Sequence, residues 1–384
     1  MISRRAAAPL ILLAALALAG CSTLDKINPF AASGKQKMAE LQSFTPSAEI
    51  RSQWQAKVGK AGDYVFTPAV VGSSVYAAAQ DGTLVRLDNG VQVWRISVGM
   101  PISGGVGSDG KLVAVGTPKG DLLAFDAADG KPLWKAKASS DILAAPAVGD
   151  DMVVVRSGDN RLYGYDQLDG KRKWVYQRTN PALSLRNAAP PLISDHHVFA
   201  GFPGGKLVAV ALQNGAAVWE GTVALPKGAT ELDRVADITS PPVIDGPQVC
   251  AVAYQGRVAC FDLTNGNLIW ARDMSSAAGM AMDSRNVYIS DDKGAVHALD
   301  RYRGASLWKQ DKLFLRQLSA PLVIRGLVAV ADVKGVVHFL NHEDGSFAAR
   351  FNTDGTPIAA LPQALEHGWL FQTTGGGLFA LDVQ

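Results

Sequence analysis

The stretch Gly120-Asp-Leu-Leu-Ala-Phe-Asp126, followed by Gly130 and Trp134, decides the fold of this chain. Eight related units recur along the sequence. Their cores occupy residues 82–88, 120–126, 160–166, 205–211, 256–262, 294–300, 335–341 and 376–382. A repeat of about forty residues, built from short β-rich runs and turn signals, is typical of four-stranded propeller blades.

Each position of the unit has a physical role. Glycine, or Asn160 in the third unit, makes the turn into a strand, and the Asp accepts hydrogen bonds in the turn that follows. A second glycine supplies a positive φ, and the tryptophan anchors the outer strand. Ala349 takes the tryptophan position of the seventh unit, whereas six units carry Trp94, Trp134, Trp174, Trp219, Trp270 and Trp308.

The eight units need eight outer strands, but only seven follow the cores. The missing strand is expected near the start of the chain, at Ile50-Arg-Ser-Gln-Trp54, where it can pair with Leu378 to Val383. Closure of the ring in this way leaves no free sheet edge. The sequence therefore predicts an all-β, eight-bladed β-propeller over residues 47–384, with an N-terminal strand that closes the last blade.

The first residues have the pattern of a bacterial lipoprotein signal. Arg4 and Arg5 precede an apolar run, and Leu18-Ala-Gly-Cys21 matches a lipobox in which the Cys21 thiol receives the lipid. We interpret residues 1–20 as a signal peptide and residues 21–46 as a lipidated tether, with one possible short helix over residues 37–44. The alternative is an ordinary signal peptide with an incidental cysteine. Because Ser22 follows Cys21, where Asp would favour the inner membrane, the outer membrane is the expected location.

Charge and cysteine content limit the function further. Cleavage before Cys21 removes two arginines from the 37 Lys+Arg, which leaves 35 against 35 Asp+Glu. A balanced chain argues against nucleic-acid binding, which relies on concentrated basic charge. Cys250 and Cys260 flank a hairpin turn, and the sequence leaves open whether they form a disulfide or stay as two buried thiols.

The residues give no catalytic, metal-binding or cofactor-binding signature. His297 and His338 share one repeat position in neighbouring blades, but no carboxylate cluster completes a ligand set, so we interpret them as strand residues in similar niches. The repeat resembles that of the pyrroloquinoline-quinone dehydrogenases, and a quinoprotein dehydrogenase or a propeller that binds a small ligand is the alternative function. Those enzymes carry a Cys-Cys pair and a calcium set that this chain lacks. A carbohydrate-binding or adhesion propeller shares the fold, but the insertions offer no aromatic-lined cleft.

Two connections are longer than the others. The interval from Trp174 to Gly205 spans 31 residues and that from Trp219 to Gly256 spans 37, against 24 to 28 elsewhere. Both insertions join an outer strand to the next inner strand, so they are expected on one rim of neighbouring blades. Their candidate partner-binding residues are Leu183, Leu185, Arg186, Asp233, Arg234 and Asp237. The alternative is that the leucines fold back onto the sheet ends and the charges are only solvated.

The lipobox, the eight repeats, Leu183-Ser-Leu-Arg186 and Ala229-Thr-Glu-Leu-Asp-Arg234 together resemble the BamB family of propeller lipoproteins. The resemblance covers nearly the whole chain. It implies a non-enzymatic scaffold of the outer-membrane β-barrel assembly machinery that binds the periplasmic POTRA domains of the BamA insertase. Nascent outer-membrane barrel proteins are further partners to consider. The resemblance implies that the Leu-Ser-Leu-Arg loop makes the contact with the POTRA domains. In the second loop, Asp237 fits the acidic pattern of the family, but Thr239 stands where a second Asp is common.

Overall fold

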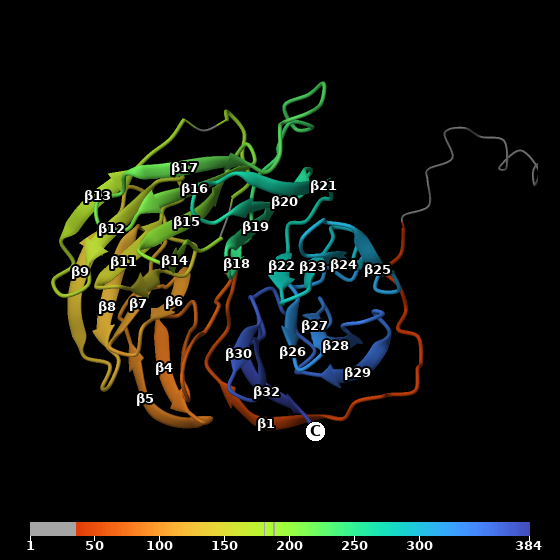
Figure 1. The fold of residues 1–384 in the computed structure, drawn as a ribbon. Coiled ribbons are helices and arrows are strands. Elements are labelled where there is room, and N and C mark those ends of the chain that lie inside the picture. The colour runs from red at the N-terminus through yellow and green to blue at the C-terminus, as the bar shows by residue number, and fades with distance from the viewer. Residues whose placement is uncertain (1–35, 180, 187–188) are drawn as a thin grey trace, which may run out of the picture. The chain divides into compact units, whose positions relative to one another are not determined.

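The computed structural model describes residues 36–179, 181–186 and 189–384. Contacts divide the chain into two compact units, Met1–Met38 and Ala39–Gln384. The second unit forms eight antiparallel sheets of four strands, arranged as blades around a ring (Figure 1). The prediction of an all-β, eight-bladed propeller is confirmed, and the described residues contain no helix.

Each blade begins with a short inner strand and a second, largely buried strand. The inner strands are β2 (Ala69–Val71), β6 (Gly104–Ser108), β10 (Ala147–Gly149), β14 (Leu192–Ser194), β18 (Val243–Asp245), β22 (Gly279–Met282), β26 (Leu322–Ile324) and β30 (Gln363–Leu365). The second strands are β3 (Ser74–Ala78), β7 (Leu112–Gly116), β11 (Met152–Arg156), β15 (His197–Phe202), β19 (Gln248–Val252), β23 (Asn286–Ser290), β27 (Leu327–Ala331) and β31 (Gly368–Gln372).

The repeat cores form the third strand of each blade, and the Asp-to-Gly turn leads to the outer strand. The third strands are β4 (Thr83–Asp88), β8 (Asp121–Asp126), β12 (Leu162–Asp166), β16 (Lys206–Ala211), β20 (Arg257–Asp262), β24 (Val296–Asp300), β28 (Val336–Asn341) and β32 (Gly377–Val383). The outer strands are β5 (Val91–Ser97), β9 (Pro132–Lys137), β13 (Arg172–Tyr176), β17 (Ala217–Thr222), β21 (Leu268–Asp273), β25 (Ser306–Gln310), β29 (Phe347–Asn352) and β1 (Ile50–Lys57).

The last blade is completed from the other end of the chain. β1 pairs antiparallel with β32, with Ile50 opposite Val383 and Trp54 opposite Ala380. In Figure 1 the orange-red β1 lies beside the blue β32. The predicted closing strand is therefore confirmed, and it ties the two ends of the propeller together.

The repeat tryptophans join neighbouring blades rather than anchoring only their own strand. The indole Nε1 of Trp134 donates to the carbonyl oxygen of Gln167 in the next blade at 2.8 Å, and five other tryptophans make the equivalent bond. The ring of Trp134 lies against Gly170, where a Cβ atom would come within 2.5 Å of the ring. Because φ is +70° at Gly170, glycine serves both the turn and the close approach.

The exception at Ala349 follows from the closure of the ring. In the next blade no turn joins the third strand β32 to the outer strand, because that outer strand is β1 from the N-terminal part of the chain. A tryptophan at this position would have no glycine turn to contact. Trp54 of β1 instead serves the last blade, since its ring lies against Gly90 of the first blade.

Cys250 and Cys260 lie opposite each other on β19 and β20. They form a disulfide between Cα atoms 4.1 Å apart, and both residues are fully buried. The structure thus resolves the alternative that the sequence left open in favour of the disulfide.

The expected short helix over residues 37–44 is wrong. The described chain before β1 is extended, and its carbonyl groups bond to side chains of the propeller rather than to its own amides. Arg316 Nη1 donates to the carbonyl oxygen of Ala39 at 3.0 Å, and Arg350 Nη1 donates to that of Gln42 at 2.6 Å.

Deletion of residues 47–57 should destabilise the propeller far more than deletion of residues 22–35. The first deletion removes β1, exposes the edge of β32 and removes the Trp54 contact, and truncation of one such tryptophan alone costs about 3–5 kcal/mol. The second deletion removes no residue of the propeller sheets. Thermal unfolding of both variants measures the difference, and equal melting temperatures would contradict the role of β1.

Candidate partner-binding rim

The two insertions lie on one face of the ring, as their positions between outer and inner strands require. They connect β13 to β14 and β17 to β18. In Figure 1 the green connection after β17 rises away from the blades. The glycine turns between third and outer strands lie at the opposite ends of the strands, and therefore on the opposite face.

The first insertion holds Leu183, Leu185 and Arg186 in a defined conformation. The backbone N–H of Leu185 donates to Asp237 Oδ2 at 2.7 Å, and Arg186 Nη2 donates to Asp141 Oδ2 at 2.9 Å. Leu183 is 41% exposed, and Leu185 is half-buried. The sequence left open whether these leucines are exposed or fold back onto the sheet ends. In the structure Leu183 faces solvent, whereas Leu185 is partly covered.

Asp237 is a buried residue whose carboxylate holds backbone groups at the rim. It is 1% exposed, and its second carboxylate oxygen accepts the backbone N–H of Gly204 at 3.0 Å. Burial lowers the pKa of the Arg156 guanidinium, and the nearby negative charge of Asp237 opposes that effect. Asp237 thus joins the end of the second insertion to the first, and its bond to Leu185 fixes the backbone beside the exposed Leu183 and Arg186.

Asp233 and Arg234 lie in an exposed turn of the second insertion. The backbone N–H of Thr230 donates to Asp233 Oδ2 at 3.1 Å, and the Asp233 N–H donates to Thr230 Oγ1 at 3.2 Å. Hydrogen bonds from the side chain and the backbone N–H of Thr230 to the carboxylate hold the pKa of Asp233 below its usual value. Arg234 donates to the carbonyl oxygen of Gly228 and to Glu231, so both charged groups stabilise the turn while facing solvent.

Two exposed leucines of the second insertion were missed by the sequence reasoning. Leu225 is 62% exposed and Leu232 is 71% exposed. Their position within a long, mostly polar insertion is the sequence feature that could have indicated their exposure. We define the rim surface as Leu183, Arg186, Leu225, Leu232 and Arg234. Exposed apolar side chains on one surface can mark a protein interface, and arginine is enriched among the residues that dominate binding.

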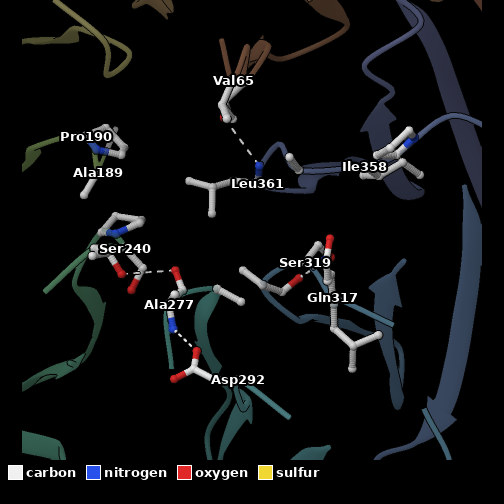
Figure 2. Close-up of a pocket in the computed structure, with 18 of the residues that line it drawn as sticks. Val65, Ala189, Pro190, Ser240, Ala277, Asp292, Gln317, Ser319, Ile358 and Leu361 are labelled. Atoms are coloured by element: carbon white, nitrogen blue, oxygen red, sulfur yellow. Dashed lines mark hydrogen bonds between the residues drawn. The ribbon is translucent and has the colours of Figure 1, made fainter. Parts of the chain in front are cut away.

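A cavity of 410 Å³ lies within the ring, lined mainly by outer-to-inner connections of the blades (Figure 2). Thr239 Oγ1 donates to the carbonyl oxygen of Ala277 at 3.1 Å, and the Ala277 N–H donates to Asp292 Oδ1 at 2.7 Å. Asp291 and Asp292 are the ionisable residues among its described lining residues. A lining with two acids and no cation does not suit an anionic quinone cofactor.

The described residues also do not gather metal ligands. Among the described residues, no group of three or more His, Cys, Asp and Glu side chains is arranged to hold a metal ion. His297 Nε2 lies 2.9 Å from Asp291 Oδ2, and His338 Nε2 lies 3.0 Å from Asp332 Oδ2. The two histidines therefore share a niche, each with an aspartate of its own blade.

Comparison with known proteins gives one consistent family. The family model described as "Outer membrane protein assembly factor BamB" matches residues 80–310. A protein of that name from Bordetella pertussis is 43% identical over 371 residues, which cover 96% of this chain and 95% of the relative. The crystal structure of BamB from Moraxella catarrhalis matches with a TM-score of 0.81 at 29% identity, over 87% of this chain and 100% of that chain.

A structure of quinohemoprotein alcohol dehydrogenase from Comamonas testosteroni matches with a TM-score of 0.68 at 14% identity, over 86% of this chain and 76% of that chain. At this identity the match shows a shared propeller fold and nothing about activity.

Substitution of Asp237 by Ala should lower the free energy of unfolding by about 2–4 kcal/mol, because two backbone N–H groups lose their acceptor. Asp237→Asn keeps one oxygen and should cost less. The matched control is Asp233→Ala in the exposed turn, which should cost less than about 1 kcal/mol. Urea unfolding measures all three variants, and equal losses at residues 233 and 237 would contradict the positioning role of Asp237.

Proposed function

The chain belongs to the BamB family of outer membrane protein assembly factors, and from this premise we propose that its rim surface binds the POTRA domains of the BamA insertase. The family description is that of an assembly factor and not of an enzyme. In this proposal the propeller is a scaffold that assists the assembly and insertion of outer-membrane proteins. Nascent barrel proteins are further candidate partners.

The observation that carries the proposal is the fixed segment around Leu185. Its backbone is held by a buried carboxylate, so Leu183 and Arg186 are presented without a large loss of conformational entropy on binding. The side chain of Arg186 is 70% exposed and remains available to a partner. Its ion pair with Asp141 does not prevent this, because a surface ion pair contributes little to stability.

The proposed location is the periplasmic side of the outer membrane, with the chain anchored by lipid at Cys21. Cys21 lies outside the described residues, so the anchor depends on the lipobox pattern. The disulfide between Cys250 and Cys260 is compatible with an oxidising compartment such as the periplasm. In the part of the chain that the structure describes, no helix is both long and apolar enough to span a bilayer.

Truncation of Leu183, Leu185 or Arg186 to Ala should weaken binding to purified POTRA domains by about 1–3 kcal/mol each, or about 5- to 150-fold in Kd. Truncation of the exposed Leu183 or Arg186 should leave the thermal stability of the protein nearly unchanged. Truncation of the half-buried Leu185 should also lower that stability somewhat. Leu168→Ala is the matched control, because Leu168 is 89% exposed in a turn on the opposite face.

Titration calorimetry and thermal unfolding of the same preparations separate binding from folding. Wild-type affinity in both Leu183→Ala and Arg186→Ala would refute this surface as the insertase site. An equal loss of affinity in Leu168→Ala would refute its location on this face.

A further inference from the structure

The extended residues 39–46, which we name the strap, are fixed to the seventh blade. The backbone N–H of Ala39 donates to the carbonyl oxygen of Phe314 at 3.0 Å, and the side chain of Leu41 packs against the buried cluster around Trp308 and Leu340. At the other end, the N–H of Ser47 donates to the carbonyl oxygen of Ala348 at 2.9 Å. The strap therefore has its own attachment, separate from the pairing of β1 with β32.

A buried polar centre lies beneath the strap. Asp332 and His338 are both 0% exposed, and Arg316 is 4% exposed. Arg316 Nε donates to Asp332 Oδ2 at 2.6 Å, and His338 Nε2 lies 3.0 Å from the same oxygen. Burial alone would raise the pKa of Asp332, but the hydrogen bonds from His338, the Val336 amide and Arg316 lower it to about 2. The carboxylate therefore stays charged.

Arg350 connects this centre to the strap. Its Nε donates to His338 Nδ1 at 3.2 Å, while its Nη1 donates to the carbonyl oxygen of Gln42 at 2.6 Å. The guanidinium also lies over the rings of Phe44 and Phe347, at 4.7 Å and 4.8 Å from their centroids. One side chain thus holds both the backbone and the aromatic ring of the strap.

The donors assign the protonation state of His338. Because Arg350 Nε–H donates to Nδ1, that nitrogen carries no proton, and Nε2–H donates to Asp332. A second proton on Nδ1 would remove the acceptor of Arg350 and place two positive charges side by side. The charged groups facing His338 are Asp332, Arg350 and Arg316.

We propose that the contact between His338 and Arg350 is a pH-sensitive latch that keeps the strap on the seventh blade at neutral pH and releases it on acidification. Protonation of Nδ1 displaces Arg350, and the strap then loses its bond at Gln42 and the cation on Phe44. The latch depends on the geometry of these contacts and requires no partner protein.

The direction of the pH dependence follows from linkage. Burial lowers the pKa of His338 from the ordinary 6.5, Asp332 opposes this effect, and Arg350 and Arg316 add to it. The docked state therefore binds fewer protons than the released state. Release therefore becomes more favourable as the pH falls, by up to tenfold per pH unit over the range in which only the released state takes up the proton.

The consequence for the proposed function concerns the length of the tether. If Cys21 carries the lipid, as proposed above, the strap lies between the anchor and the propeller. Release of the strap would lengthen the connection to the propeller by up to about 26–29 Å at full extension. Acidification would thus allow the propeller to move farther from the membrane.

The test is hydrogen exchange of the strap in the purified full chain, measured at pH 7 and pH 5 and corrected for the intrinsic effect of pH. Exchange of the Ala39 and Ser47 amides should be about tenfold faster at pH 5, while the amides of β1 stay protected. The neutral variant His338→Gln retains a donor and an acceptor, so it should lose the pH dependence. His297→Gln is the matched control, because His297 has the same aspartate partner position without a strap.

Equal corrected exchange at the two pH values in the wild-type chain would overturn the latch. Retained pH dependence in His338→Gln, or its loss in His297→Gln, would also overturn it. If His338→Gln does not fold, Phe44→Ala tests the strap side: it should speed exchange of the strap amides at pH 7 without lowering the melting temperature of the propeller. None of these readings depends on the lipid anchor or on binding to the insertase.

Discussion

The contact between a tryptophan and the turn of the next blade is the constraint on which this structure depends. Each indole places its ring on a glycine and its N–H on a carbonyl group of the neighbouring blade. One residue therefore sets both the distance and the register between two sheets. This contact involves the outer strands and the glycine turns, which lie on one face of the ring. The connections on the opposite face take no part in it and can be longer, and the rim surface lies on that face.

The sequence was sufficient to predict the features that the repeat determines, namely the blades and their closure. It was not sufficient to predict features that depend on single side-chain contacts. The glycine, aspartate and tryptophan spacing indicated eight blades, and the shortage of one outer strand pointed to Ile50–Trp54, within β1 (Ile50–Lys57). The burial of Asp237 was beyond reach, because the sequence does not reveal that its carboxylate bonds to backbone groups of Leu185 and Gly204. The extended strap was also missed, since two arginines distant in sequence replace the hydrogen bonds of the expected helix.

The fold is shared with quinone-dependent enzymes, but the features that distinguish this chain are local. Two acids are the ionisable residues among the described lining of its cavity, whereas the rim surface has exposed leucines and arginines. In the first insertion, Asp237 holds the backbone of Leu185. Binding sites of this kind gain from being fixed in advance, because ordering a loop on association costs free energy. A rigid ring with two inserted connections is therefore well suited to hold another protein.

In the proposed function the rim, and not another face of the propeller, meets the insertase. Site-specific photo-cross-linking in intact cells, with a photoreactive residue at position 183 or at position 168, tests this placement without purification. We expect a covalent adduct with the insertase from position 183 and none from position 168. An adduct from position 168, or none from position 183 in a chain that still folds, would contradict the placement of the insertase on the rim.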